Sequence, residues 1–264
     1  MLRSALIAVL LGLGLLVVVD AARRSHKPPA PSVQAHIQPG APATPQPVPV
    51  RPTVMPAVAP ESPPETPALD MMARLAIRRR LVREGDRVYL DAMLANTDSV
   101  LTRWTDRTVL TVALVADSTL PGWNAALISE ARAALHVWDG NGAGVTLQEA
   151  SNTDSADIKV HWLVALSDSG QIGTTTLGWS SDGVVHSAVI TLALRRNTDS
   201  AVVPAGMRSR AAAHEFGHAL GLPHSDDAND IMFRTAPVGV PSPRDQATLR
   251  LLYAVPPGSL RVQP

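Results

Sequence analysis

HEFGHALGLPHS occupies residues 214–225 and places three of the chain's 8 histidines within eleven positions. His214 and His218 are four residues apart, so in a helix their side chains lie one above the other on the same face. Two imidazoles in this arrangement can each reach one cation at about 2.0–2.1 Å, the usual zinc–nitrogen distance. Glu215 lies about 100° around the helix from His214, beside such a metal, where a carboxylate can serve as a general base.

The residues around this segment predict where the helix begins and ends. Ser209 is a suitable N-cap, the run 210–220 is rich in helix formers, and Gly221 can end the helix in a left-handed conformation. Gly217 costs about 1 kcal/mol in a helix relative to alanine, so packing or metal binding must offset it. Because a straight helix cannot bring His224 back to the metal, the chain must turn after Gly221. Three neutral imidazoles leave a fourth position open, which is typical of catalytic zinc sites.

The pattern HExxHxxGxxH resembles the metzincin motif. All its fixed positions are filled, by His214, Glu215, His218, Gly221 and His224. Metzincins also have a methionine turn beneath the zinc, and NDIMF places Met232 eight residues after the last histidine. This spacing, with Ser225 directly after that histidine, is most similar to the matrixin branch, which includes matrix metalloproteases and bacterial relatives. The resemblance implies a hydrolase: a zinc endopeptidase in which the three histidines hold one Zn²⁺, the glutamate is catalytic, and Gly221 and Met232 give structural support.

Two alternatives use the same residues differently. The histidines could hold zinc in a non-catalytic surface binding module, or they could be satisfied by hydrogen bonds without any metal. A purely structural zinc site needs no general base and no open position, so Glu215 favours the endopeptidase. The ligands alone do not distinguish peptide or protein substrates from other substrates.

The chain departs from the matrixin pattern near the methionine. Phe233 follows Met232 where many matrixins have tyrosine, and Arg234 replaces the usual proline, so side-chain specificity is not predicted. His161, on a polar face, and His186, on an apolar face, lack the partners of a second zinc site. Both are expected to be structural.

An acidic loop follows the third histidine and is a candidate calcium site, although a solvated acidic turn is the commoner outcome. Its residues are Asp226, Asp227 and Asp230. Vertebrate-type matrixins stay latent through a prodomain cysteine that ligates the zinc. This chain has no cysteine, so any latency must use another device. A formal net charge of zero argues against nucleic acid as a partner.

The N-terminus has the layout of a secretory signal. Arg3 precedes an apolar run over residues 5–19, and small residues follow at Ala21 and Ala22. Residues 1–24 are therefore expected to be a signal peptide or an N-terminal membrane anchor, with anchoring through residues 4–22. Either reading implies an extracytoplasmic protein, secreted or membrane-anchored. The oligomeric state is not predicted.

Composition divides the rest of the chain. Prolines are concentrated before residue 68, so residues 25–67 are expected to be a disordered, semi-rigid linker. Residues 68–103 mix apolar and arginine residues and predict a pair of short helices. These are expected to be a helical hairpin that packs on the domain with a solvated basic face. Less favoured alternatives are a pro-segment and a basic helix that binds a surface. The catalytic domain is expected over 104–256, with a tail at 257–264.

Within this domain, the hydrophobic pattern predicts both strands and helices. A helix is expected between Pro121 and Gly140, with a buried stripe formed by Trp123, Leu127, Ala131, Leu135 and Trp138. Strands are expected at 108–116, 157–164, 172–179 and 184–194, and a closing helix, with Tyr253 in packing, near 242–254. This order resembles the matrixin catalytic domain: an α+β fold with a mixed, mostly parallel twisted sheet, an active-site helix, a Met turn and a C-terminal helix. The resemblance also implies that the strand at 173–179 binds substrate by strand addition.

Overall fold

The computed structural model describes residues 70–91, 93, 100–105, 108–168 and 170–261. The predicted leader and proline-rich linker, residues 1–24 and 25–67, lie outside the described residues. The described residues belong to one compact unit, Pro60–Pro264. Within them, every helix is too short or too polar to cross a membrane.

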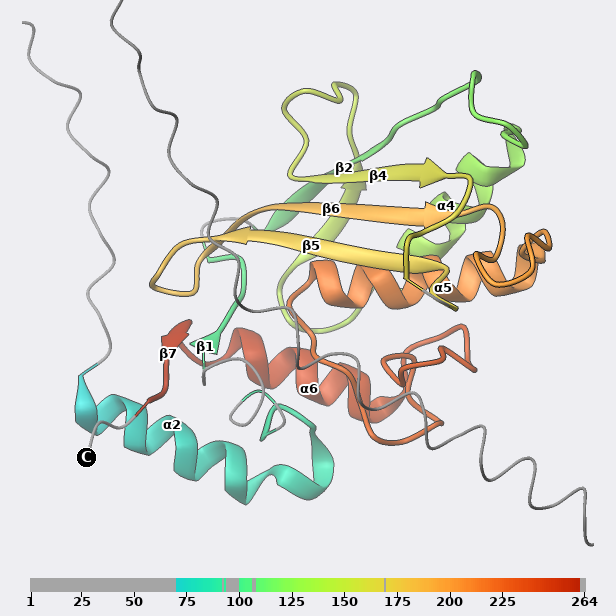
Figure 1. Cartoon of the computed structure of the whole chain (residues 1–264). Helices are drawn as coiled ribbons and strands as arrows, with labels where there is room; N and C mark the ends of the chain where they lie inside the picture. Colours follow the sequence, from blue (N-terminus) through green and yellow to red (C-terminus); the bar gives the residue numbers. More distant parts are fainter. Residues whose placement is uncertain (1–69, 92, 94–99, 106–107, 169, 262–264) are drawn as a thin grey trace, which may run out of the picture. The chain divides into compact units, whose positions relative to one another are not determined.

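Five strands form one mixed sheet in the order β3-β2-β4-β6-β5 (Figure 1). Four of them are parallel, whereas β5 is antiparallel to β6 and lies at the edge. Their bounds are β2 Val109–Leu114, β3 Thr146–Glu149, β4 Ile158–Leu163, β5 Gly173–Trp179 and β6 Val185–Ala193. The predicted α+β class with a mostly parallel sheet is confirmed. β3 is absent from the predicted strands because only one of its four residues, Leu147, is buried.

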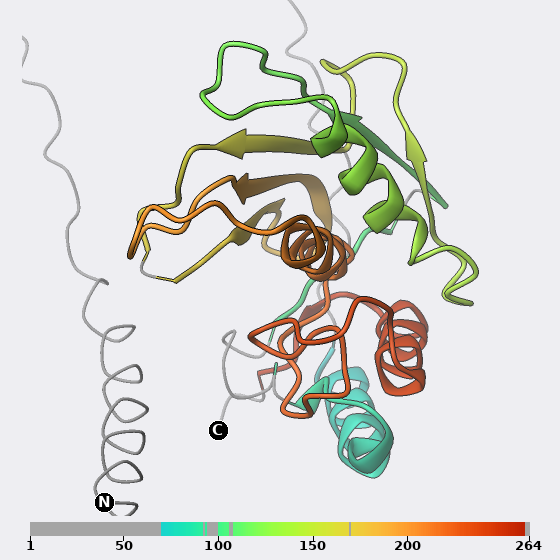
Figure 2. The ribbon, with the colours of Figure 1, turned by 90° about the vertical axis from the view of Figure 1, so that its right-hand side faces the viewer.

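Two helices, α4 (Ala126–His136) and α5 (Ala205–Ala219), pack side by side on one face of this sheet (Figures 1 and 2). A part-buried ion pair joins them, with Arg208 Nη2 2.7 Å from Glu130 Oε1. The remaining elements gather around α6 (Figure 2). They are α2 Met71–Arg83, the 3₁₀ turn η1 Gly85–Arg87, α6 Pro243–Tyr253, and a small sheet of β1 Val100–Leu101 and β7 Gly258–Ser259.

The alternation predicted for 157–164 is present in β4. Ile158, Val160 and Trp162 are buried, while Lys159 and His161 lie on the more open face. This is what a period of two residues requires of a strand with one buried face.

The prediction that His186 lies on an apolar face is wrong, because its side chain is exposed. The cause is a register shift in β5 between Gly178 and Trp179. Gly178 pairs with Ser187 and Trp179 pairs with Val185, so His186 is the extra residue of a bulge. Two successive side chains of β6 therefore face solvent, which simple alternation does not predict.

The helix predicted from Pro121 begins later, at Ala126. Pro121 and Gly122, which has φ +89°, instead form a turn. Trp123 therefore lies outside the helix and is only half-buried. The other four members of the predicted stripe are buried as expected: Leu127, Ala131, Leu135 and Trp138.

In the described part of 68–103, helix α2 is followed by the 3₁₀ turn η1, and Asp91 and Met93 are also helical, so the predicted pair of short helices is not contradicted. Ile77 and Leu81 of α2 are buried, and Arg78 donates a hydrogen bond to the carbonyl oxygen of Leu260. Val88, Tyr89 and Leu90 are also buried. The segment is therefore packed against the rest of the unit, while its role as hairpin or pro-segment and the boundary at residue 104 stay predictions.

Candidate metal centre

Helix α5 begins at Ala205, one turn before the predicted start, so the proposed N-cap at Ser209 is wrong. Pro204 is the N-cap, with φ −61° and ψ 146°. Its carbonyl oxygen accepts hydrogen bonds from the backbone N–H groups of Met207 and Arg208. A proline suits the start of a helix because its fixed φ is compatible with the helix and it has no N–H to satisfy.

The end of α5 is formed by Gly221, as predicted. Its φ is +98°, and a Cβ there would lie 2.5 Å from the carbonyl oxygen of Thr102. Only glycine fits both the left-handed conformation and this close approach of backbone. The turn after Gly221 then carries the chain back to His224.

Three aromatic side chains donate hydrogen bonds to carbonyl oxygens of α5 and of its C-cap. Trp138 Nε1 lies 2.8 Å from Ala213 O and Trp104 Nε1 lies 2.8 Å from Ala219 O. Tyr253 Oη lies 3.1 Å from the carbonyl oxygen of the C-cap Leu220, which confirms its predicted packing role. The last carbonyls of a helix have no partner within the helix, so Trp104 and Tyr253 satisfy groups that would otherwise need water.

The structure brings His214, His218 and His224 together. Each histidine offers one ring nitrogen, and these three nitrogens all lie within 4.8 Å of one another. His218 Nε2 is 3.2 Å from His224 Nε2. Ring centroids are 4.7 Å apart for the pairs 214–218 and 218–224, and 5.3 Å apart for 214–224. This is the only group in the described part of the chain with three potential metal ligands so close.

Hydrogen bonds at Nδ1 orient two of the rings. His214 Nδ1 donates to Ile231 O at 2.7 Å, and His218 Nδ1 donates to Leu222 O at 2.8 Å. Since a carbonyl oxygen only accepts, Nδ1 carries the proton in both rings, and Nε2 presents its lone pair. Such a partner at the second ring nitrogen is the usual accompaniment of a metal-ligating histidine.

The donor set fits zinc. A tetrahedral site with zinc–nitrogen bonds of about 2.0–2.1 Å has edges of about 3.3–3.4 Å, close to the 3.2 Å between the Nε2 atoms of His218 and His224. His218 Nε2 presents a lone pair in this contact, because the Nδ1 atom of the same ring carries the proton. Three imidazoles with a free fourth direction are the ligands of a catalytic zinc site.

Glu215 lies beside the histidines and is 6 % exposed. Its Oε2 accepts a hydrogen bond from Thr175 Oγ1 of β5 at 2.7 Å. Burial raises the pKa of Glu215 to about 7, although the hydrogen bond from Thr175 opposes this shift. A carboxylate with a pKa near neutrality is matched to proton transfer at physiological pH.

Comparison with known proteins adds to this geometry. Residues 204–250 match the matrixin peptidase family. The chain is matrixin-like. Over 145 residues it is also 35 % identical to a protein of Paracentrotus lividus called hatching enzyme. That match covers 49 % of this chain and 23 % of the relative, so the chain spans about a quarter of the relative's length.

In this matrixin-like chain the methionine turn lies directly beneath the ligand helix. Met232 is fully buried, and its backbone carbonyl accepts from Ser225 N at 2.9 Å, next to His224. A Cβ at Gly217 would lie 2.2 Å from Met232 Sδ and 2.8 Å from Trp138 Cζ2. Close packing of the Met turn therefore explains the glycine in the middle of the helix.

Gly217→Ala is expected to lower the free energy of unfolding by about 1–3 kcal/mol, despite the better helix propensity of alanine, because the new methyl group overpacks the core. Gly206→Ala in the first turn of the same helix is the control. A Cβ at Gly206 would have Arg210 Nη1 as its nearest neighbour, at 3.8 Å, so this variant should be neutral or more stable. Denaturant unfolding of both variants measures the difference. Equal stabilities would show that Met232 moves aside without cost.

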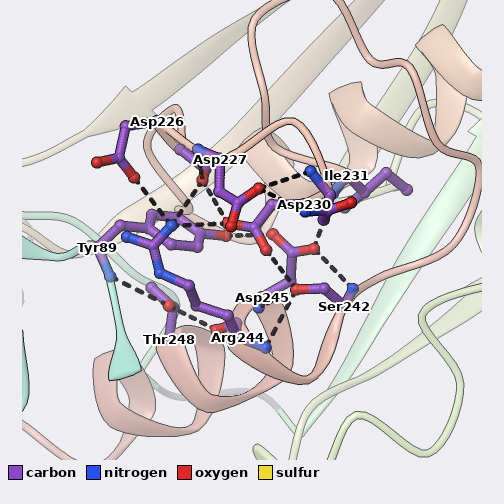
Figure 3. Close-up of polar contacts among 11 residues, drawn as sticks. Tyr89, Asp226, Asp227, Asp230, Ile231, Ser242, Arg244, Asp245 and Thr248 are labelled. Atoms are coloured by element: carbon purple, nitrogen blue, oxygen red, sulfur yellow. Dashed lines mark hydrogen bonds and ion pairs between the residues drawn. The ribbon is translucent and has the colours of Figure 1, made fainter. Parts of the chain in front are cut away.

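A second feature of the matrixin-like site is a buried network of carboxylates below the Met turn (Figure 3). Asp245 is fully buried, and its Oδ2 accepts from Ile231 N at 2.8 Å and from Ser242 N at 2.7 Å. Asp230 is 2 % exposed and accepts from the hydroxyl groups of Ser225 and Ser242. Asp230 thus holds Ser225, the residue after His224, and Asp245 holds Ile231, whose carbonyl oxygen orients His214.

The loop of the candidate calcium site belongs to this network. Arg244 Nη1 lies 2.9 Å from both Asp226 Oδ1 and Asp230 Oδ2. Asp230 is therefore a buried ion-pair partner, and the expected solvated turn is wrong for this residue. Its charge is already matched by arginine, so the acidic loop gives no support to calcium. His161 and His186 lie outside the histidine group, as expected.

The sequence analysis misses Thr175, Tyr89 and Asp245. For Asp245 a local signal exists, because SPRD at 242–245 has the spacing of a capping box, which the structure contains. For the other two, the partners are distant in sequence and no local pattern indicates them.

In the zinc-free matrixin-like chain, acid is expected to lower the free energy of unfolding. Burial and then the neighbouring imidazoles lower the pKa of His218 from 6.5 to about 3, and burial also lowers the pKa of His214 and His224. As pH falls through 6.5, the unfolded chain binds protons at these residues and the folded chain does not. Protonation of Glu215 in the folded chain raises the free energy of unfolding between about pH 7 and 4.5, but this one group is outweighed by the three histidines.

Thermal unfolding in the presence of a chelator, from pH 7.5 to 4.5, measures this effect. The midpoint temperature should fall steadily below about pH 6.5. The Glu215→Gln variant should fall more steeply, because it lacks the one group that takes up a proton in the folded state. A flat profile for the unmodified chain would contradict the expectation.

Proposed function

We propose that this chain is a zinc-dependent endopeptidase in which His214, His218 and His224 hold one zinc ion and Glu215 is the general base. The observation that carries the proposal is the convergence of three imidazoles, two of them oriented by hydrogen bonds at Nδ1, beside a buried carboxylate with a pKa near 7. A zinc-binding module without catalysis would need the three ligands but not this carboxylate.

Bound zinc would supply Lewis acidity, which polarises the scissile carbonyl and makes water a better nucleophile near neutral pH. Thr175 holds Oε2 of Glu215, so Oε1 is the oxygen that accepts the proton of the attacking water. Glu215 then delivers this proton to the leaving amide nitrogen, which must be protonated before the peptide bond breaks. The hydrogen bond from Thr175 keeps the carboxylate aimed at the site through both transfers.

We further propose that β5 binds the substrate as an added antiparallel strand. Among the described residues β5 is the edge strand of the sheet, so one row of its backbone N–H and C=O groups has no neighbouring strand there. Thr175 lies on this strand and contacts both the side chain and the carbonyl oxygen of Glu215. A peptide aligned along β5 would therefore pass close to the general base.

The site fits peptides as a class, and nothing in it defines a sequence preference. An extracytoplasmic location, secreted or membrane-anchored, is part of the proposal and depends on the leader-like residues 1–24. The name of the relative, hatching enzyme, is not transferred, because the match covers only 23 % of that protein.

The test is incubation of the zinc-loaded full chain with casein and with a quenched peptide library. Cleavage that a chelator abolishes and added zinc restores is expected, and mass spectrometry of the products would give the specificity. Stoichiometric zinc without cleavage of any peptide would reject the endopeptidase and favour the zinc-stabilised binding module.

A further inference from the structure

Tyr89 lies far from the histidines in sequence, in the segment that follows η1, and is 2 % exposed. Three contacts fix it against α6. Its hydroxyl donates to Asp245 Oδ1 at 2.6 Å, its backbone N–H donates to Thr248 Oγ1 at 3.4 Å, and its ring faces the guanidinium of Arg244 at 5.2 Å (Figure 3). Burial, followed by the charge of Asp245, raises the pKa of Tyr89, so the hydroxyl stays protonated and remains a donor.

Asp245 continues this chain of contacts toward the metal centre. While Oδ1 accepts from Tyr89, Oδ2 accepts from the backbone N–H of Ile231. The carbonyl oxygen of Ile231 accepts the Nδ1 proton of His214 at 2.7 Å. Ile231 of the Met turn thus donates its N–H to Asp245 and accepts the Nδ1 proton of His214 with its C=O.

The buried carboxylate makes this arrangement sensitive to the tyrosine. Asp245 is completely shielded from solvent, so each of its oxygens needs a protein donor. Removal of the Tyr89 hydroxyl takes away the donor to Oδ1 and leaves Ile231 and Ser242 on Oδ2 alone. The carboxylate is then free to turn, and any turn moves Ile231 and the acceptor that fixes the ring of His214.

We propose that Tyr89 is a positioning residue of the metal centre, acting on His214 through Asp245 and the backbone of Ile231. The inference rests on the proposed function only in that the three histidines take zinc. The sequence pattern predicts that the catalytic domain starts at residue 104. The proposed role of Tyr89 extends the functional domain to residues before that position. A protease cut between Tyr89 and Trp104 would separate this tyrosine from the ligand helix, whereas processing before Val88 would retain it.

The experiment compares the full chain with its Tyr89→Phe and Thr111→Val variants. Both substitutions delete one hydroxyl that donates to a buried carboxylate. The Thr111 hydroxyl donates to Asp157 at 2.7 Å, on β2 and away from the histidines, so Thr111→Val controls for a general loss of stability. Zinc affinity is measured by competition with a chromophoric chelator, which does not depend on peptidase activity.

Tyr89→Phe is expected to raise the zinc dissociation constant about three- to tenfold, somewhat less than is usual for direct partners of metal ligands. Thr111→Val should stay within about twofold of the unmodified chain, even at a similar loss of thermal stability. An unchanged dissociation constant for Tyr89→Phe would overturn the inference. So would an equal weakening in both variants, because it would show a general effect of stability.

Nitrogen-edited NMR of the imidazoles in the zinc-free chain provides a second readout. The Nδ1 signals of His214 should move in Tyr89→Phe, whereas those of His218 should not, because its acceptor is Leu222 O. Equal movement of both rings, or of neither, would overturn the inference. An unmodified chain that binds zinc and cleaves peptides while Tyr89→Phe changes nothing would leave the endopeptidase standing. An unmodified chain that binds no zinc would overturn both.

Discussion

Glu215→Gln is expected to lower kcat/KM for peptide cleavage by about 10²–10⁴-fold, the usual contribution of a general base. Glutamine has almost the same shape, and its carbonyl oxygen can still accept the hydrogen bond from Thr175. It cannot take a proton from the attacking water. The residue is not one of the metal ligands, so the zinc content should stay at one ion per chain. Peptide kinetics and metal analysis on the same preparation separate these two effects.

A matched control is available on the neighbouring strand. Thr176 follows Thr175 on β5 but is exposed, so Thr176→Val alters the strand without touching the carboxylate. This variant should retain the zinc and, because it keeps Glu215, a far larger share of the activity than Glu215→Gln. If Glu215→Gln cleaved peptides at the rate of the unmodified chain, the assignment of the general base would be wrong. If it lost its zinc, its role would be structural.

His218→Ala is expected to abolish both zinc binding and cleavage. Two imidazoles remain, and the ligand nitrogen closest to His224 Nε2, at 3.2 Å, is gone. Zinc at a thousandfold excess over its dissociation constant stabilises a protein by about 4 kcal/mol. The variant should lose this stabilisation, so added zinc should no longer raise its midpoint temperature of unfolding. Calorimetry with and without zinc measures the difference.

His186→Ala is the control for loss of a histidine. Its side chain is exposed on the bulge of β6 and lies outside the ligand group, so both the zinc-dependent stabilisation and the cleavage should persist. A zinc-dependent shift in His218→Ala equal to that of the unmodified chain would contradict the ligand assignment. Loss of zinc from His186→Ala would point to a site elsewhere on the chain.

The arrangement of the histidines could be predicted from sequence because local geometry determines it. Residues four apart share a helix face, and Gly221 marks the turn that returns the third ligand. The strands of the sheet could also be predicted from the sequence where one face is buried, as in β4. In both cases the pattern and the structure depend on residues that are neighbours in the chain.

The sequence-based predictions fail where the local structure depends on residues that are distant in the sequence or lie upstream of the predicted element. The start of α5 depends on Pro204 rather than on the best side-chain cap, Ser209. The exposure of His186 depends on a bulge in β6 that arises from its pairing with β5. The contact of Tyr89 with Asp245 joins residues 156 positions apart, and neither side chain carries a local sign of its partner.

The aromatic donors on α5 have a consequence for how the chain handles its metal. Trp104, Trp138 and Tyr253 anchor the backbone of the ligand helix with bonds that involve no histidine. In small zinc-finger domains the metal itself drives folding, and chelation unfolds the chain. Here three hydrogen bonds from other parts of the fold hold the helix that carries His214 and His218. If zinc binds as proposed, its release should therefore leave the chain folded, and loss of the metal would reversibly inactivate the proposed peptidase.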